Sequence, residues 1–421
     1  MLSALMSPAG PQFDVIVVGG GASGLIAAGH AAERKKRVLL IEKNKRLGEK
    51  LRISGGGRCN ITNAEYDTRV LLQHYGKAEQ ALYSLFSQFG VKDTFSFFES
   101  HGLPLVVEAR KRAFPQSERA LDVVRTLETY VQSEGVEILC GAPVTDVSAT
   151  KEGIQSVSVG SNTYFAKEFI FSTGGVSHPE TGSTGDGFLW LKKIGHSVVK
   201  PTPTIVPIKT EEVWSKKLAG VSLSPMKITF FTERKKLFAE EGGVLFTHFG
   251  LSGPLILNCA HKVADALHSG AVTAAIDAYP KTDAGALEKN ILATFDVHKN
   301  KSLKNCVNDF VPDGMGRGIL LLLSEQIDIS KKVHSVSKDE RKYIAKTLKA
   351  LPLTVSGLMG FDRAVVADGG VPLAEIDTRT MRSKRVPNLF VIGDLLHINR
   401  PSGGFSLQLC WSTGYVAGEH C

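Results

Sequence analysis

The sequence has few cysteines and no cluster of metal ligands. Its six cysteines are scattered through 421 residues, with no Cys-x-x-Cys pair and no Cys/His group at zinc spacing. This pattern excludes the usual kinds of zinc site and predicts free thiols in a reducing compartment. We therefore expect no bound metal.

Segments for membrane insertion or export are also missing from the sequence. No apolar run approaches the roughly 20 residues that a membrane-spanning helix requires. Residues 1–12 lack the basic start and the apolar core of a signal peptide. We expect a soluble, cytoplasmic protein that has no membrane partner.

Glycine and positive charge, by contrast, are plentiful. The 42 glycines exceed the usual share of about 7%, which suggests that the backbone comes close to a ligand. The net charge of +8 fits a polyanionic partner such as RNA, and it equally fits a solvated basic surface.

The clearest motif is a β-α-β unit near the start of the chain. The sequence predicts a strand over 14–18, a helix over 25–34 and a second strand over 37–42, with Gly-x-Gly-x-x-Gly at the first turn. Its glycines permit the tight turn, the approach of a diphosphate and the packing of helix on strand. The acidic residue that closes the second strand would accept hydrogen bonds from the adenosine ribose and disfavour NADP. We predict that this unit binds FAD through Gly19, Gly21, Ala22, Ser23, Gly24, Glu42 and Lys43.

A glycine-rich loop over 54–60 is the second candidate contact with the cofactor. Its backbone amides and arginine could meet anionic or carbonyl oxygens, although a surface turn without a ligand is the alternative. Ala64 stands five residues after Cys59, so a dithiol relay with a local resolving cysteine is excluded. The predicted contacts here are Gly48, Lys50, Ser54, Gly55, Gly56, Arg58, Cys59 and Asn60.

Two further glycine-rich segments follow predicted strands. A small-residue strand end near 172–175 either lies beside the cofactor or closes the sheet. A carboxylate near 394 could accept hydrogen bonds from ribityl hydroxyls, and a helix opening near 402–405 would place its positive end by the reduced flavin. The predicted contacts are Val144, Thr173, Gly174, Gly175, Gly393, Asp394, Gly403, Gly404, Phe405 and Ser406. No second Gly-x-Gly-x-x-Gly follows a strand, so a nicotinamide donor would bind transiently.

The order of patterns along the chain predicts one domain interrupted by an insertion. Closely spaced prolines over 200–207 indicate a connection between subdomains. The chain then reads as strands to about 283 and as lysine-rich helices over 284–350 before α/β character resumes. We predict an α/β fold with a Rossmann-like FAD-binding domain over 13–199 and 362–421, a β-rich subdomain over 200–283 and 351–361, and a helical subdomain over 284–350.

Together these motifs resemble the BaiN/RdsA, or aminoacetone-oxidase-like, family of NAD(P)/FAD-dependent oxidoreductases. The most specific strings are SGGGRCN at 54–60 and FTHFGLSGP at 246–254. The resemblance implies a two-dinucleotide-fold FAD domain, FAD as cofactor and NAD(P)H as transient donor. It also implies hydride transfer from flavin N5 to a conjugated C=C, in a small molecule or in a uridine of ribosomal RNA. An aminoketone oxidase that uses O₂ and a non-catalytic, FAD-bound RNA-binding or assembly protein are the alternatives.

The chain departs from this family near its C-terminus. The family usually has Gly-Glu-x-Leu-Asp and Gly-Gly-Tyr-Asn, where this chain has Gly-Asp-Leu-Leu-His over 393–397 and Gly-Gly-Phe-Ser over 403–406. His397 removes a carboxylate and Phe405 removes a phenol. Contacts that relatives make through that carboxylate and that phenol are therefore not expected here, whereas Asp394 can still bind ribityl hydroxyls.

The reaction also needs a proton donor, because the flavin carries only the redox step. Our first candidate is His248, whose imidazole titrates near neutral pH and which lies in the FTHFGLSGP string; a structural role in that turn is the alternative. Cys59 is the second candidate, against a packed thiol. The lysines of the insertion would grip an RNA backbone if they converge and would serve solubility if they scatter.

Overall fold

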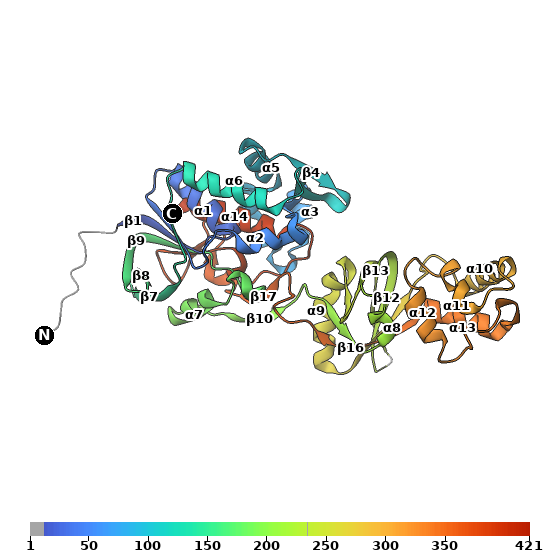
Figure 1. Cartoon of the computed structure of the whole chain (residues 1–421). Coiled ribbons are helices and arrows are strands. Elements are labelled where there is room, and N and C mark those ends of the chain that lie inside the picture. Colours follow the sequence, from blue (N-terminus) through green and yellow to red (C-terminus); the bar gives the residue numbers. More distant parts are fainter. Residues whose placement is uncertain (1–11, 234) are drawn as a thin grey trace. The chain divides into compact units, whose positions relative to one another are not determined.

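The computed structural model describes residues 12–233 and 235–421, which form two compact units (Figure 1). Unit 1 comprises the described residues up to Thr202 together with Val366–Cys421, and unit 2 comprises Pro203–Val365. The prediction that residues 1–12 hold no signal peptide falls, residue 12 apart, outside the described residues. None of the helices in the described ranges has the length and apolar character needed to cross a lipid bilayer.

Unit 1 is built on a parallel sheet. Its central order is β20-β9-β1-β2-β6, and each of these neighbouring pairs is parallel. The five strands are β1 (Phe13–Val18), β2 (Val38–Glu42), β6 (Glu137–Cys140), β9 (Asn162–Phe171) and β20 (Leu389–Val391). Antiparallel strands add to the sheet in two places. Beyond β20 lie β19 (Arg382–Ser383) and β18 (Ile376–Asp377), and β8 (Gly153–Val159) with β7 (Val144–Thr150) branches from β9. The predicted α/β fold with a parallel sheet is confirmed.

Helices and two small sheets complete unit 1. The helices are α1 (Ala22–Glu33), α2 (Glu49–Ile53), α3 (Thr68–Gln73), α4 (Glu79–Gln88), α5 (Val91–Ser100), α6 (Ala120–Ser133), α7 (Asp186–Lys193) and α14 (Phe405–His420). One small sheet has the order β3-β5-β4, with β3 (Thr62–Asn63), β5 (Arg112–Pro115) and β4 (Leu105–Glu108). The other pairs β10 (Val199–Pro203) with β17 (Ala367–Gly370).

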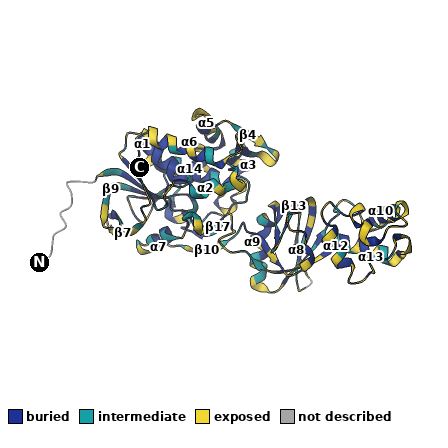
Figure 2. Ribbon diagram, viewed as in Figure 1, coloured by how far each residue is buried: buried dark blue, intermediate teal, exposed yellow. Residues whose placement is uncertain are grey.

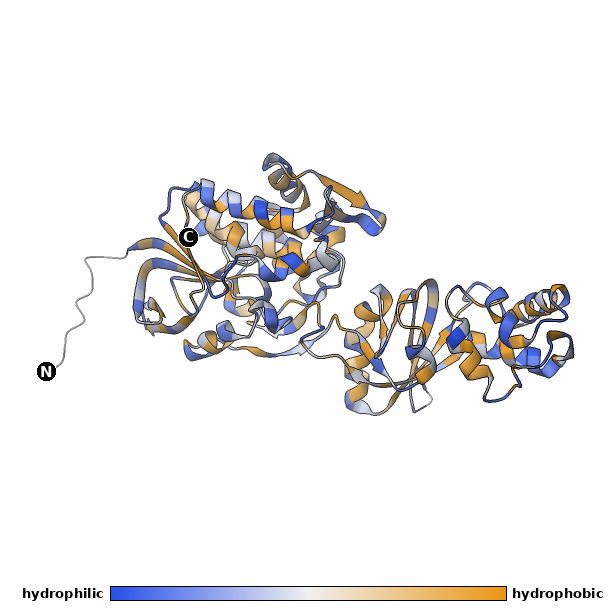
Figure 3. Ribbon diagram, viewed as in Figure 1, coloured by the Kyte–Doolittle hydropathy of each residue, from blue (hydrophilic) through white to orange (hydrophobic). Residues whose placement is uncertain are grey.

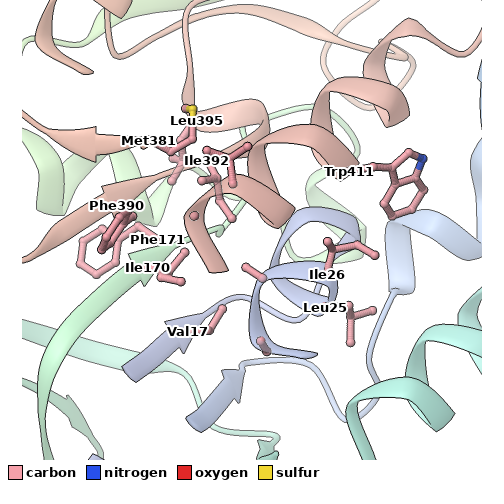
Figure 4. Packing of buried hydrophobic residues seen from close by; sticks show 14 of the residues in the cluster. Val17, Leu25, Ile26, Ile170, Phe171, Met381, Phe390, Ile392, Leu395 and Trp411 are labelled. Atoms are coloured by element: carbon pink, nitrogen blue, oxygen red, sulfur yellow. The ribbon is translucent and has the colours of Figure 1, made fainter. Parts of the chain in front are cut away.

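The core of unit 1 lies between the sheet and the layer of α1 and α14 (Figures 2 and 4). Strand residues such as Val17 and Phe171 and helix residues such as Ile26 and Trp411 are almost completely buried. Burying a side chain of this size contributes roughly 1.5–3 kcal/mol. The α1 helix is buried along nearly its whole length because α14 covers the side that the sheet does not, and the two helices pack closely.

Unit 2 contains a closed barrel in the order β11-β14-β13-β12-β15-β16. The strands are β11 (Ile208–Thr210), β12 (Ser222–Thr232), β13 (Lys235–Thr247), β14 (Gly250–Ser252), β15 (Val272–Asp277) and β16 (Leu351–Leu358). The helices are α8 (Val213–Lys216), α9 (Pro254–Ser269), α10 (Ala284–Val297), α11 (Leu303–Cys306), α12 (Gly316–Leu323) and α13 (Lys338–Lys349). The α10–α13 segment mixes hydrophilic with hydrophobic residues (Figure 3).

Two details of unit 2 differ from the sequence-based reading. The stretch over 254–269 was expected to be extended but forms the helix α9, because Pro254 occupies its first turn and Leu255, Cys259 and Val263 recur at helical spacing on the buried side. The sequence predicts a β-rich and a helical subdomain, whereas the barrel and the helices that follow it share one hydrophobic core. Ile228 of β12 and Ile291 of α10 both belong to this core.

Candidate functional site

Four loops of unit 1 meet at one edge of its sheet. Because β1, β2, β9 and β20 are parallel, the segments that follow Val18, Glu42, Phe171 and Val391 all leave the sheet at its carboxyl edge. Ligands of open α/β sheets bind outside this edge. The structure thus brings together most of the predicted cofactor contacts of unit 1.

The first of these loops leads into α1 and has the features of a diphosphate cradle. Gly19 has a φ of +108°, and a Cβ atom there would lie 2.5 Å from the carbonyl oxygen of Ser172. A Cβ atom on Gly24 would lie 1.9 Å from the carbonyl oxygen of Gly19, whereas nothing lies within 4 Å of such an atom on Gly21. The first turn of α1 carries no acidic residue and no side-chain cap. Its first amide groups are therefore left without a side-chain acceptor, which suits an anion.

Glu42 is held firmly at the end of β2. Its Oε2 accepts a hydrogen bond from the Gly20 amide at 2.7 Å, and its Oε1 accepts one from the Asn44 amide at 2.8 Å. Burial raises the pKa of this carboxyl group. A carboxylate oxygen has two acceptor positions, so each oxygen keeps one for a ligand hydroxyl. Its neighbour Lys43 donates instead to Thr184 and Asp186, at 2.5 and 2.7 Å.

The segment after β9 carries a buried hydroxyl without a partner. The Ser172 hydroxyl donates to the carbonyl oxygens of Val18 and Gly19 at 2.9 and 2.8 Å. Among the described residues, the Thr173 Oγ1 atom is buried and has no hydrogen-bond partner. Leaving such a group unsatisfied costs about 1–3 kcal/mol, so a ligand that reached this atom would gain a hydrogen bond from it. Gly174 and Gly175 follow, and a Cβ atom on Gly175 would lie 3.2 Å from the Asp394 carbonyl oxygen.

The glycine-rich loop after α2 exposes backbone as predicted, but its arginine is engaged elsewhere. Gly55 and Gly56 are exposed and have φ values of +57° and +68°. Arg58 pairs with Glu108 and with Glu118, the latter at 2.8 Å, and its guanidinium lies 4.2 Å from the centre of the Phe114 ring. The two carboxylates neutralise this cation, so the structure favours a role in anchoring the loop over the predicted contact with an anion.

Cys59 is completely buried at the end of this loop. Burial raises the pKa of its thiol to about 12, and its Sγ atom is in contact with the core of unit 1. A thiol with this pKa keeps its proton at neutral pH. The structure therefore favours a packing role over the predicted role as a proton donor. Ser54 donates to the Leu51 carbonyl oxygen at 2.7 Å, and the Asn60 side-chain amide lies 3.0 Å from the Gly404 amide nitrogen.

Asp394 and Arg400 follow β20, and Lys50 of α2 lies near them. Asp394 pairs with Arg400 through one carboxylate oxygen, and its other oxygen lies 3.9 Å from Lys50 Nζ. Lys50 Nζ also donates to the Ser177 hydroxyl at 3.3 Å. Arg400 donates further to the Ile398 carbonyl oxygen at 2.6 Å and to the Ser406 hydroxyl at 3.1 Å. Arg400 is not among the residues predicted from the sequence, although it stands two residues before the Ser-Gly-Gly turn at 402–404.

The start of α14 differs in part from the prediction. Gly404 has a φ of +100° and is pressed against the backbone between Thr62 and Asn63. The Phe405 ring is buried and contacts the rings of His74 and Tyr75, at 4.6 and 6.1 Å between ring centres. This side chain belongs to the core, because the helix that it begins turns its first apolar residue inward. The predicted contact of Phe405 with the cofactor is therefore not available to its ring.

The remaining predicted residues occupy varied positions. Gly48 begins α2 and donates from its amide to the Gly20 carbonyl oxygen at 2.9 Å. Val144 begins β7 and is half-buried. Gly393 has a φ of +64°, and a Cβ atom there would lie 2.6 Å from the Ser23 hydroxyl oxygen. His397 lies 3.3 Å from Asp368.

His248 belongs to unit 2, in the turn between β13 and β14. Its side chain is exposed, and its ring meets that of Phe249 edge-on at 4.9 Å between centres. Each unit thus contains one of the two predicted proton donors, Cys59 in unit 1 and His248 in unit 2. Within the described residues, no group of three His, Cys, Asp or Glu side chains is placed to hold a metal ion.

Seven basic residues of the helical segment fall into two sets. Four of them are neutralised in ion pairs: Lys301 with Asp309, Lys331 with Glu340, Arg341 with Glu288 and Lys349 with Asp277. Lys338, Lys342 and Lys346 are exposed on α13 at intervals of four residues and so lie on one face of that helix. Three of the lysines predicted to grip RNA thus lie in one short row.

The residues at the carboxyl edge fit FAD. The open amides of α1, the fixed carboxylate of Glu42 and the unpartnered Thr173 hydroxyl provide a diphosphate site, a ribose acceptor and a further donor. This combination defines an FAD-binding oxidoreductase of the Rossmann type.

Comparison with known proteins gives the family. The family described as HI0933-like protein Rossmann domain matches residues 13–420, and the chain belongs to this family of FAD-dependent oxidoreductases. The resemblance to the BaiN/RdsA family is confirmed.

Relatives align over nearly the full length of the chain. A 3-dehydro-bile acid delta(4,6)-reductase of Clostridium scindens is 27% identical, with 96% of this chain and 97% of that protein covered. A ribosomal RNA dihydrouridine synthase of Escherichia coli is 28% identical, with 97% and 98% covered.

Solved structures of low sequence identity share the fold. A 3-ketosteroid-delta4-(5alpha)-dehydrogenase from Rhodococcus jostii has a TM-score of 0.55 at 13% identity, over 99% of this chain and 98% of that one. A flavocytochrome c3 fumarate reductase has a TM-score of 0.55 at 16% identity, over 98% and 78%.

Proposed function

We propose that this protein is an FAD-dependent reductase that takes hydride from NAD(P)H and saturates a C=C bond conjugated with a carbonyl group. The open cradle at Gly21, at the same sheet edge as the fixed carboxylate of Glu42, is the observation that carries the proposal. Bound FAD would supply the two-electron chemistry, accepting hydride from the nicotinamide and passing hydride to the β carbon of the substrate.

The chain's own residues would bind and orient the cofactor. The first amides of α1 would hold the diphosphate, and Glu42 would accept hydrogen bonds from the adenosine ribose. Both oxygens of Glu42 are already fixed by backbone amides, so its carboxylate needs no reorganisation when a ribose arrives. Thr173 Oγ1 would donate to the cofactor and thereby satisfy its own buried hydroxyl.

His248 remains our candidate for the proton donor to the α carbon. Its exposed imidazole can exchange protons with solvent, which Cys59 cannot do from the core. The substrate is either a small enone or a uridine of ribosomal RNA, in line with the names of two relatives whose reactions saturate such bonds. The exposed lysine row of α13 supports the RNA substrate, because it can bind phosphates.

The test has two stages. Purified protein should carry FAD, and anaerobic addition of NADH or NADPH should bleach its absorbance near 450 nm; a flavin that neither donor reduces would contradict the proposed donor. Ribosomal RNA from wild-type and deletion strains should then be compared by nucleoside mass spectrometry. Loss of one dihydrouridine on deletion would assign the RNA substrate, and an unchanged profile would assign a small molecule.

A further inference from the structure

Two cations and only one carboxylate lie together at the carboxyl edge of the sheet. The side chains of Arg400, Asp394 and Lys50 are 1%, 19% and 28% exposed. Asp394 contacts both cations, yet its single charge can balance only one of them. When Lys50 is protonated, the three side chains therefore carry one net positive charge.

The surroundings of Lys50 do not supply the missing negative charge. Burial lowers the pKa of the Lys50 ammonium, and the attraction of Asp394 offsets this only in part. Glu180 also attracts Lys50, but it is engaged with His178 at 2.8 Å and is largely exposed. The Lys50 side chain keeps 28% of its surface exposed, so an anionic ligand can approach it and would stabilise its charged form.

Helix ends add to the positive potential of this cluster. Arg400 donates to Ser406 in the first turn of α14, where a helix terminus is already positive. Ser23, in the first turn of α1, lies against Gly393, next to Asp394. A Cβ atom on Gly174 would lie 3.8 Å from Lys50 Nζ, which places the ammonium beside the segment that contains Thr173.

We infer that Lys50 stabilises the negative charge that FAD acquires when it accepts a hydride, and that Asp394 and Arg400 position Lys50 for this role. The inference rests on the proposed function. A hydride carries two electrons and one proton, and its donor leaves as NAD(P)⁺. The cofactor then gains one negative charge unless a second proton follows from solvent, and a fixed cation in a site of low dielectric lowers the cost of that charge.

The test compares Lys50→Met, Lys50→Arg and Asp394→Asn with the wild type. Lys92→Met is the matched control, because Lys92 is an exposed lysine on α5 of the same unit. Two quantities are measured for each protein: the Kd for oxidised FAD and the midpoint potential of the bound flavin. Thermal unfolding checks that each variant is folded.

The two charge changes should move the potential in opposite directions. We expect Lys50→Met to weaken the preference for reduced over oxidised FAD about tenfold, which is a fall of about 30 mV for a two-electron couple. The Kd for oxidised FAD should change less than about threefold, or about 0.6 kcal/mol. Lys50→Arg should retain most of the wild-type potential. Asp394→Asn removes negative charge and should raise the potential, an effect that a merely structural role would not produce.

Several outcomes would overturn the inference. A large loss of affinity for oxidised FAD in Lys50→Met, at an unchanged potential, would assign Lys50 to the diphosphate. Shifts of the same sign in Lys50→Met and Asp394→Asn, or no shift beyond that of Lys92→Met, would also reject it. In each of these cases the proposed function stands, whereas a folded wild type that binds no FAD would remove the proposed function together with the inference.

Discussion

Gly24 lies so close to Gly19 that a Cβ atom on Gly24 would stand 1.9 Å from the Gly19 carbonyl oxygen. The contact joins the first turn of α1 to the end of β1, and backbone on the opposing side cannot move aside. Gly21, three residues earlier, faces open space instead. Two glycines of one motif thus serve different purposes, packing of the fold and access of a ligand.

This difference predicts opposite phenotypes for two alanine variants. Gly24→Ala should destabilise unit 1 by on the order of 3 kcal/mol, because the clash is with backbone. Gly21→Ala should cost less than about 1 kcal/mol of stability but should weaken FAD binding at least about tenfold, or about 1.4 kcal/mol. Thermal unfolding and flavin fluorescence titration measure the two effects. Wild-type FAD affinity in a folded Gly21→Ala variant would show that the diphosphate lies elsewhere.

A buried network in unit 1 predicts a dependence of stability on pH. His196 contacts Glu375 at 2.7 Å and Ser383 at 2.8 Å, and Arg385 donates to Glu375 at 2.7 Å. Burial alone would raise the pKa of Glu375, but hydrogen bonds from Arg385, Ser197 and His196 outweigh it and lower this pKa to about 2. Burial lowers the pKa of His196, so its ring is neutral at neutral pH.

A carboxyl group whose pKa is lowered on folding stabilises the folded state above its unfolded pKa of about 4.5. This stabilisation is lost as pH falls toward 2. Glu375→Gln should therefore lower the free energy of unfolding of unit 1 by on the order of 2 to 3 kcal/mol at pH 7 and by much less near pH 2.5. This difference can be measured by urea unfolding in a Trp214→Phe background, in which the tryptophan fluorescence comes from Trp190 and Trp411 of unit 1. An equal effect at both pH values would contradict the lowered pKa.

The burial of Cys59 predicts low thiol reactivity. Cys140 is the exposed cysteine among the described residues, and Cys59 has no exposed surface. Iodoacetamide at pH 8 should modify Cys59 at least about a hundredfold more slowly than Cys140, because both access and thiolate are lacking. Peptide mass spectrometry over a time course measures the two rates, and Cys140→Ser should remove the fast phase. Rapid modification of Cys59 in the native protein would reinstate it as a candidate proton donor.

The proposed role of His248 predicts a selective kinetic defect. His248→Gln should leave thermal stability and the reduction of FAD by NAD(P)H unchanged, since the side chain is exposed in a turn of unit 2. Transfer from reduced FAD to the substrate should slow by about 10²-fold or more. Stopped-flow measurement of the two half-reactions separates these steps, with His268→Gln on α9 as the matched control. If His248→Gln and His268→Gln transfer hydride from reduced FAD to the substrate at the same rate, His248 is not the proton donor.

The sequence by itself determined the β-α-β unit and the place of its glycine-rich turn. Strand and helix periodicities are local, and the demands on Gly19, Gly21 and Gly24 arise within six residues. The strands of β12 and β13 and the helices after residue 284 also follow from local patterns. These features need no knowledge of distant contacts.

Only the tertiary structure decided which polar groups are free. Arg58 is neutralised by Glu108 and Glu118, fifty and sixty residues away, and Cys59 is enclosed by a core that other segments complete. The charge balance around Arg400 depends on Asp394 and on Lys50, which comes from a distant part of the chain. Charge compensation and desolvation depend on which residues are in contact in the folded chain, and spacing along the sequence does not predict these contacts.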